Sequence, residues 1–319
     1  MQAFIIYYEF EAVKNKGFID LFTGYGKESG IDFKLLFFDG SVDGFKEKYK
    51  DLFLNFRENP LFESEITNHI SDGGNTNQNY DNKLLFVLNR TRCYELSRYF
   101  EDNNIKVYNS SDLVRIANDK FETFKFLQKK LPDINFTDTD IFEFKNDFDA
   151  FKNAIEKFSG RRAVIKCVSG HGGSEVWLVD LEDYNSIIDT FKAISDSNES
   201  KKYIIQEFVP SDSMDLRVYV MDGNIYSAVL RKGEGSFKSN FSLGGGFFEY
   251  KLSAEEEAYI NRFIDALSGE NYGFIGIDFL VTSSGELVFN EIEEMVGTRM
   301  LYNIGKNDIV KDFLENIVI

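Results

Sequence analysis

Three carboxylates near the C-terminus have the spacing of a metal site. Asp278 lies in GFIGIDFLV, and Glu291 and Glu293 lie in ELVFNEIEE, which follows the turn SSG. Strand side chains alternate between two faces, so the two glutamates share a face, and Asp278 faces them if the segments pair as a hairpin. Such carboxylates repel one another without a cation, and oxygen ligands suit Mg²⁺ or Mn²⁺. The alternative is a solvated acidic strand face.

Cationic side chains that suit phosphate precede this hairpin. Lys166 lies in the apolar run AVIKCV, directly before the glycine-rich loop SGHGGS, whose N–H groups can approach phosphates. Arg217 in DLRVYV and Arg231 at the end of SAVLR offer planar forks for phosphate or acyl phosphate oxygens. Alternatively, Lys166 is an exposed strand residue before an ordinary hairpin, and the arginines are edge-strand cations that balance the acidic face.

Composition excludes several other classes of chemistry. The 319-residue chain has a net charge of −17, so nucleic acid and anionic membrane are poor partners. Only two histidines occur, which excludes a His-rich zinc site and disfavours a Ser-His-Asp triad. The two cysteines lack metal-type spacing. No apolar run is long enough to span a membrane, and the N-terminus resembles a first strand more than a signal peptide, so we expect a cytoplasmic protein.

The pattern of elements predicts an α/β and α+β protein with three domains. Residues 1–114 form a βαβ pattern typical of a Rossmann-like domain, in which 40–82 is irregular. Residues 115–208 form a small α+β lobe, and 209–319 form a strand-rich lobe with a turn at Asp222-Gly223. The predicted strands are 3–8, 31–39, 84–89, 105–109, 163–168, 175–179, 202–209, two around the 222–223 turn, and the 273–294 hairpin. The predicted helices are 16–29, 91–104, 111–130, 146–158, 182–194, 253–268 and one from about 306, and 242–247 is predicted as a loop.

The order of these features resembles the ATP-grasp superfamily, in particular RimK-type glutamate ligases and D-alanine–D-alanine ligases. The matching segments run from about Asn118 to Leu301. They are NDK, AVIKCVSGHGGSEVWLV, YIIQEFV, DLRVYV, VLRKG, SNFSLGGG, GFIGIDFLV and VFNEIEEMVG. The resemblance implies an ATP-grasp fold with an N-terminal Rossmann-like domain, ATP with Mg²⁺ (or Mn²⁺), and carboxylate and amine substrates that are small molecules or peptides. Many relatives are dimers, so a homodimer is a candidate assembly.

The resemblance also implies roles for single residues. Lys120 and Lys166 would hold ATP phosphates, under the loop with His171, Gly172 and Gly173. Gln206, Glu207, Phe208 and Val209 would meet the adenine edge, and Asp212 or Asp215 would take the ribose hydroxyls. Arg217 and Arg231 would neutralise phosphate, Asn240 and Gly244, Gly245 and Gly246 would line the acceptor side, and Asp278, Glu291 and Glu293 would bind Mg²⁺.

Two departures concern the substrate end. The family usually has Asn where Glu293 stands, and the turn after it differs. We hypothesise that Arg299, just beyond this turn, contacts a substrate carboxylate or phosphate.

In the first domain, Asn89 and Arg90 follow a predicted strand at the edge where ligands bind in open α/β sheets. A capping turn before helix 91–104 is the equally simple interpretation of these two residues.

The expected reaction needs no histidine. A carboxylate attacks the γ-phosphate of ATP, and an amine then attacks the acyl phosphate to form an amide, with ADP and phosphate as the other products. The alternatives are a different acyl product such as an ester or thioester, modification of a peptide, a nucleotide-binding regulator without turnover, and a structural protein that binds no nucleotide.

Overall fold

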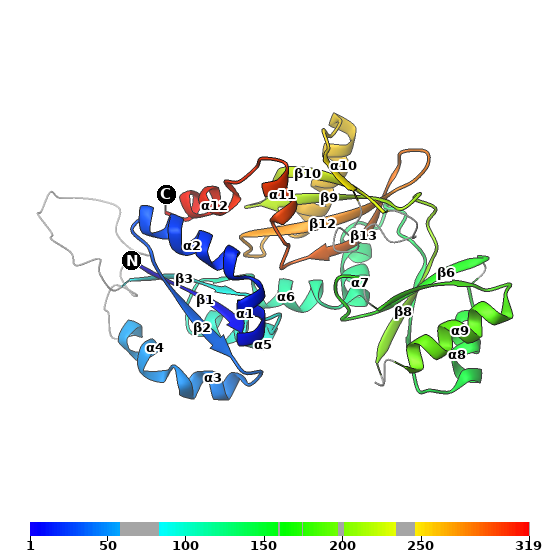
Figure 1. The fold of residues 1–319 in the computed structure, drawn as a ribbon, viewed down its shortest axis with the longest axis horizontal. Helices are drawn as coiled ribbons and strands as arrows, with labels where there is room; N and C mark the ends of the chain where they lie inside the picture. The colour runs from blue at the N-terminus through cyan, green and yellow to red at the C-terminus, as the bar shows by residue number, and fades with distance from the viewer. Residues whose placement is uncertain (58–82, 159, 174, 197–200, 234–245, 319) are drawn as a thin grey trace, which may run out of the picture. The chain divides into compact units, whose positions relative to one another are not determined.

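The computed structural model describes residues 1–57, 83–158, 160–173, 175–196, 201–233 and 246–318. The chain divides into two compact units, which are coloured by residue number in Figure 1. Unit 1 comprises Met1–Val114, Glu270–Gly273 and Asn307–Ile319, and unit 2 comprises Arg115–Gly269 and Phe274–Lys306. Among the described residues, no helix is both long enough and apolar enough to cross a bilayer.

Unit 1 is built on a parallel four-stranded sheet, as its βαβ pattern predicts. The strand order is β2-β1-β3-β4, so the order reverses between β1 and β3. Parallel strands need helical crossovers that cover both faces, which explains why these strands are almost continuously apolar. The strands are β1 (Gln2–Tyr8), β2 (Asp32–Phe38), β3 (Leu84–Asn89) and β4 (Val107–Tyr108).

Aromatic side chains pack helices onto both faces of this sheet. On one face, Phe22 of α2 contacts Phe33 and Phe313, and the latter belongs to α12. On the other face, Phe45 and Phe53 are buried in a cluster with residues of α5. The helices of unit 1 are α1 (Glu9–Lys14), α2 (Lys16–Glu28), α3 (Val42–Lys48), α4 (Lys50–Arg57), α5 (Tyr94–Glu101) and α12 (Ile309–Val318).

The prediction that 40–82 is irregular was wrong for residues 42–57, which form α3 and α4. Phe45 and Phe53 are 1% and 3% exposed, and their burial stabilises two short helices in a segment whose sequence is mostly polar. Residues 58–82, which include the predicted loop 71–82, lie outside the described part of the chain.

The helix predicted over 111–130 is two helices, α6 (Ser111–Ala117) and α7 (Lys120–Lys130). The break falls at Asp119, whose carboxylate accepts hydrogen bonds from the N–H groups of Phe121 (2.9 Å) and Glu122 (3.1 Å). An aspartate that caps a helix satisfies N–H groups that have no partner within the helix. The cap therefore restarts the helix and places Lys120 as its first residue.

The first half of unit 2 contains an antiparallel sheet of order β5-β8-β6-β7, which we call the small sheet. Helices α8 and α9 cover one face, where Phe151 and Ile187 pack with Ile165 and Tyr203. The elements are β5 (Thr139–Glu143), α8 (Phe148–Ile155), β6 (Arg162–Cys167), β7 (Val176–Asp180), α9 (Tyr184–Ser195) and β8 (Lys202–Glu207).

The second half of unit 2 contains an antiparallel sheet of order β11-β10-β9-β12-β13, which we call the large sheet. Asp222 and Gly223 have positive φ (46° and 73°), as the predicted hairpin turn requires. The loop prediction for 242–247 was wrong at its end, because β11 begins at Gly246; residues 242–245 lie outside the described part. The elements are β9 (Met214–Met221), β10 (Asn224–Lys232), β11 (Gly246–Glu249), α10 (Ala254–Ala266), β12 (Phe274–Val281), β13 (Leu287–Glu293) and α11 (Arg299–Asn303).

The two faces of the large sheet differ in chemistry. On one face, Phe279 and Phe289 pack against Phe263 of α10, and Phe289 also contacts Phe124 of α7. Because strand side chains alternate, the residues next to Phe279 and Phe289 along their strands, such as Asp278, point to the opposite face. That opposite face carries the charged residues of the candidate site.

Candidate active site

The register of the large sheet places the predicted carboxylates and arginines on one face. Asp278 of β12 lies opposite Arg217 of β9 and opposite Glu291 of β13. Residues directly opposite in an antiparallel sheet share a face, so the prediction that Asp278 faces the glutamates across the last hairpin is confirmed. Arg231 lies opposite Asp215 on the same side of the sheet.

Asp278 is the centre of a buried ion-pair network. It is 0% exposed and accepts hydrogen bonds from Arg217 Nε (2.8 Å), Arg217 Nη2 (2.7 Å) and Arg231 Nη2 (2.7 Å). Arg231 also pairs with Asp215 through Nε at 2.6 Å. Burial alone would raise the pKa of Asp278, but the two arginines outweigh it and lower the pKa to about 2. Asp278 is therefore ionised and holds both guanidinium groups in place.

The two glutamates lie at the edge of this network. Glu293 forms an ion pair with Arg217, and Glu291 Oε2 lies 3.7 Å from Lys120 Nζ. Desolvation raises the pKa of Glu293; Arg217 opposes this rise, while the charges of Asp278 and Glu291 add to it. A carboxylate whose charged form is disfavoured in this way gains stability from an added cation.

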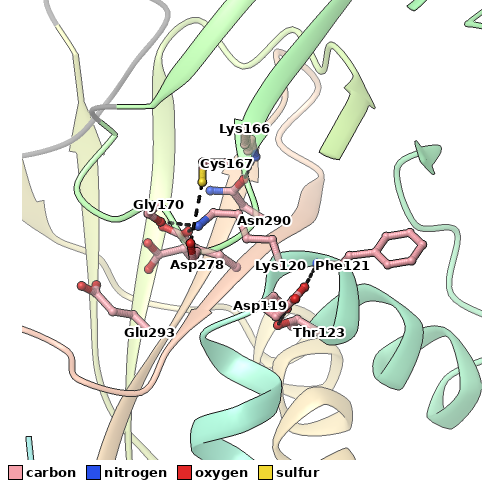
Figure 2. A network of polar contacts seen from close by, with 12 residues as sticks. Asp119, Lys120, Phe121, Thr123, Lys166, Cys167, Gly170, Asp278, Asn290 and Glu293 are labelled. Carbon is pink, nitrogen blue, oxygen red and sulfur yellow. Dashed lines mark hydrogen bonds and ion pairs between the residues drawn. The ribbon is translucent and has the colours of Figure 1, made fainter. Parts of the chain in front are cut away.

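A β-bulge brings a further side chain into the site. Asp278 is opposite Glu291, but the next residue of β12, Phe279, is opposite Phe289, so Asn290 is the extra residue of β13. Bulges re-aim side chains, and Asn290 Oδ1 accepts a hydrogen bond from Lys166 Nζ at 2.8 Å (Figure 2). Residue spacing did not single out Asn290, because the position of a bulge depends on the pairing of two strands.

The two lysines lie close together at this end of the site. Burial of its amino group is the main cause that lowers the pKa of Lys166 to about 8; Glu291 opposes the shift and Lys120 adds to it. Lys120 Nζ donates to the carbonyl of Gly170 at 2.5 Å, and its backbone N–H donates to Val168 O at 3.0 Å. Figure 2 shows Lys120, Lys166 and Asn290 grouped beside Gly170.

A pocket of unit 2 connects these groups to the predicted adenine segment. Its empty volume is about 880 Å³, part of which is open to solvent. Val164 and Val176 of the small sheet and Leu280 and Phe289 of the large sheet give it apolar walls. Of the residues predicted to hold the nucleotide, Lys120, Lys166, Gly172, Gly173, Gln206, Glu207, Phe208, Val209 and Asp215 line it, as do Asn290 and Glu291.

Other predicted residues lie apart from the pocket lining. His171 and Asp212 are exposed, and neither lines the pocket. Asp215 does line it, but its carboxylate pairs with Arg231, which limits its use for ribose hydroxyls. Arg299 is exposed at the start of α11. Gly246 is exposed in β11, whereas Asn240, Gly244 and Gly245 lie outside the described residues.

The oxygen atoms at this end of the site are of the kind that Mg²⁺ binds. Among the described residues, no group of three His, Cys, Asp or Glu side chains is arranged to hold a metal ion. Asp278 is occupied by the arginines, whereas Glu291 and Glu293 share a strand face beside the Asn290 amide oxygen. Carboxylate and amide oxygens are ligands that Mg²⁺ accepts. Glu291, Glu293 and Asn290 carry oxygens of the kind that suits the ion, and each is paired with Lys120, Arg217 or Lys166 in this structure. Metal binding by Asp278, Glu291 and Glu293 stays a prediction, with Asn290 as an additional candidate.

A comparison with models of protein families shows to which family the chain belongs. Residues 117–317 match the model of the RimK-like ATP-grasp domain, which is more than half of the chain. The chain belongs to the RimK-like ATP-grasp family. The match covers the small sheet, the large sheet and every pocket residue named above.

Curated relatives are 26–28% identical to this chain over the aligned regions. The uncharacterized protein MG011 of Mycoplasma genitalium is 26% identical over 239 residues, which are 74% of this chain and 75% of that protein. A probable alpha-L-glutamate ligase of Shewanella pealeana is 28% identical over 70% of this chain but only 46% of its own length. A probable alpha-L-glutamate ligase of Coxiella burnetii is 27% identical over 69% of each chain.

Solved structures share the ATP-grasp fold at lower identity. The D-alanine–D-alanine ligase of Bacillus anthracis complexed with ATP superimposes with a TM-score of 0.67 at 14% identity, covering 100% of this chain and 97% of that one. A RimK domain ATP-grasp protein of Sphaerobacter thermophilus gives 0.61 at 14% identity, covering 100% and 99%. The predicted ATP-grasp fold is thereby confirmed.

Proposed function

We propose that the protein is an ATP-dependent ligase that joins a carboxylate to an amine through an acyl phosphate, with ADP and phosphate as co-products. The observation that carries the proposal is the pocket of unit 2, in which two lysines meet Asn290 and Glu291 at one end and the segment 206–209 lies at the other. These groups match the parts of ATP: cations for its phosphates, an apolar slot for its adenine ring, and backbone groups for the polar edge of the adenine.

The nucleotide takes its position from both sheets in this proposal. The adenine ring lies between the valines of the small sheet and Leu280 of the large sheet. Its polar edge meets the segment Gln206–Val209, where the N–H groups of Glu207 and Phe208 already bond to Asp138 and Arg162. Val209 thus offers the next backbone N–H along this segment.

The phosphates lie at the lysine end. The ammonium groups of Lys120 and Lys166 bind phosphate oxygens, and the loop 169–173 folds over them, with Gly172 and Gly173 at positive φ (66° and 75°). Lys120 fastens this loop already without nucleotide, through its bond to the Gly170 carbonyl. Mg²⁺, when bound at Glu291, Glu293 and Asn290, would supply charge neutralisation of the phosphates.

The arginines serve the substrate carboxylate. Arg217 and Arg231 lie on the charged face beside Glu291 and Glu293, and Asp278 fixes their orientation before any ligand arrives. Fixed cations lower the repulsion between an attacking carboxylate and the γ-phosphate, and they stabilise the negative charge of the transferring phosphoryl group. The amine attacks the activated carbonyl afterwards, and phosphate leaves.

The relatives favour an amino acid as one substrate. Two of them are named probable alpha-L-glutamate ligases, so we propose L-glutamate, or a peptide that ends in it, as a substrate to test first. The chain spans less than half of the Shewanella protein, and the second substrate is therefore left to experiment.

A screen of ADP release tests the proposed function. The full chain with MgATP is assayed against amino acids and dipeptides in pairs, and products are identified by mass. We expect ADP release that requires both substrates, with a product mass equal to their sum minus one water. ATP binding with no ADP release across the panel would favour a regulator without turnover, and no ATP binding would refute the nucleotide site.

A further inference from the structure

Unit 1 buries an arginine that has no anionic partner within the described residues. Arg90 is 6% exposed and follows Asn89, the last residue of β3. Its guanidinium lies over the ring of Phe18 of α2, 5.0 Å from the ring centre. In the described part of the chain its Nε is buried without a hydrogen-bond partner, and no carboxylate lies within ion-pair distance.

Other arginines of the protein show how unusual this is. Arg217 and Arg231 are buried to a similar extent, and both pair with carboxylates. Arg92, two residues from Arg90, pairs with Glu11 at 3.2 Å. A buried guanidinium without an anion costs free energy, since both its charge and its N–H groups lose water. Buried charges are normally paired, so an unpaired one marks a candidate site for a ligand that carries the missing anion.

The position of Arg90 in the fold matches a ligand site. The strand order of unit 1 reverses between β1 and β3, and Arg90 stands at the carboxyl end of β3, at this point. In open α/β sheets ligands bind at such switch points. Its backbone N–H bonds to Ile6 O of β1, so the backbone at Arg90 is fixed by the sheet.

A second buried polar group without a partner belongs to the neighbouring strand β1. Ile6 of β1 is paired with Asn89 of β3, so the next residues, Tyr7 and Arg90, share the other face of the sheet. The hydroxyl of Tyr7 is buried and has no hydrogen-bond partner among the described residues. Both groups are donors for which the described residues supply no acceptor.

The neighbouring residues of the turn have a different role. Asn89 accepts hydrogen bonds from Thr91 N (3.1 Å) and Thr91 Oγ1 (2.7 Å), and it donates to Ser97 Oγ (2.9 Å). All the polar atoms of the Asn89 side chain therefore hold the turn before α5. The capping interpretation applies to Asn89, and only Arg90 is left for a ligand.

We propose that Arg90 is the centre of a carboxylate-binding site within unit 1, for a ligand of the amino-acid or peptide class. A guanidinium fork matches a planar carboxylate with two parallel hydrogen bonds, and the Phe18 ring beneath holds the fork in one orientation. The choice of an amino-acid or peptide ligand rests on the proposed function.

The test uses the full chain and variants Arg90→Met and Arg90→Lys. Binding of L-glutamate, isoglutamine (its α-carboxamide), glutamine (its γ-carboxamide) and inorganic phosphate is followed by thermal shift and calorimetry, with and without MgATP. We expect wild-type protein to bind glutamate and only one of the two amides. Arg90→Met should weaken glutamate at least about tenfold and abolish the preference between the amides, and Arg90→Lys should recover part of the affinity.

The matched control is Arg98→Met, an exposed arginine of the same unit that pairs with Asp112. It should bind every probe like wild type. Stability separates a ligand group from a structural one: Arg90→Met should melt at or above the wild-type temperature without ligand, because it removes an unpaired buried charge. Equal glutamate binding by wild type and Arg90→Met, a preference for phosphate, or no binding of any carboxylate probe would overturn the proposal. Failure of the proposed function shows separately, as a wild-type protein that does not bind MgATP.

Discussion

Lys166 donates a hydrogen bond to Asn290 over 2.8 Å, and this bond joins the small sheet to the large sheet within unit 2. The residues are 124 positions apart in the chain. The amide oxygen of Asn290 carries no net charge, so it holds the amine of Lys166 only weakly. The amine can therefore exchange this partner for a phosphate oxygen. The bond therefore marks where we expect the nucleotide to enter the network.

The affinity for ATP should fall with rising pH above about 8. Burial lowers the pKa of Lys166 to about 8 in the free protein, and phosphate oxygens favour the ammonium form, so the pKa is higher when ATP is bound. Binding then takes up a proton at pH above 8, and Kd rises by up to about tenfold per pH unit until the pKa of the complex is reached. Calorimetry between pH 7 and 10 measures this.

Lys166→Arg is the control for this pH dependence, because arginine keeps its charge throughout the range. Its Kd for ATP should vary little between pH 7 and 10. A wild-type Kd that is constant over the same range would refute the assignment of Lys166 to the phosphates.

Asp119→Ala should weaken ATP binding through the position of Lys120. The substitution removes the cap of α7 and costs about 1 kcal/mol of folding free energy. Because Lys120 is the first residue of that helix, the Kd for ATP should also rise by roughly three- to tenfold. Asp147→Ala removes the cap of α8, away from the pocket lining, and should cost similar stability with unchanged Kd.

Asp278→Asn should destabilise the fold more than any surface substitution. It leaves Arg217 and Arg231 with an incompletely neutralised buried charge, at a cost of about 3–5 kcal/mol. Chemical denaturation measures the change. Asp133→Asn, which breaks the exposed pair with Arg262, is the matched control and should change stability little. Equal effects of the two variants would show that the buried network is not important for folding.

Glu291→Gln should separate chemistry from folding. Glu291 is only partly buried and pairs with Lys120 at 3.7 Å, so its stability cost should be small. Turnover should fall on the order of 100-fold, and the Mg²⁺ concentration needed for half activity should rise. Activity assays over a Mg²⁺ series measure both, and an unchanged Mg²⁺ dependence would remove Glu291 from the metal site.

Local sequence signals predicted much of the framework. The turn Asp222-Gly223 and the alternating pattern of 273–294 depend on neighbouring residues alone, and both hairpins form. The predictions for α3, α4 and β11 were wrong because these elements depend on distant partners: Phe45 and Phe53 on the core of unit 1, and β11 on pairing with β10. The division of helix 111–130 depended on the side-chain cap of Asp119.

Residue types and order identified the candidate site, but not its internal pairing. Spacing placed Asp278 with the glutamates, whereas its two arginine partners depend on the adjacency of β9, β10 and β12. The pairing of β9 with β10 likewise brings Asp215 into contact with Arg231. Asn290 reaches the site through a bulge that the sequence does not reveal. Arg90 was a candidate on sequence grounds, but its lack of a partner among the described residues depends on the tertiary structure.

Transfer of an isotope from the substrate carboxylate to phosphate tests the proposed ligase reaction most directly. The full chain is incubated with MgATP, an amine panel and glutamate labelled with ¹⁸O in its carboxylates, and the released phosphate is analysed by mass spectrometry. An acyl phosphate requires that one labelled oxygen appears in phosphate, together with ADP and an amide product. Release of AMP, or of phosphate without label while the amide forms, would contradict the account.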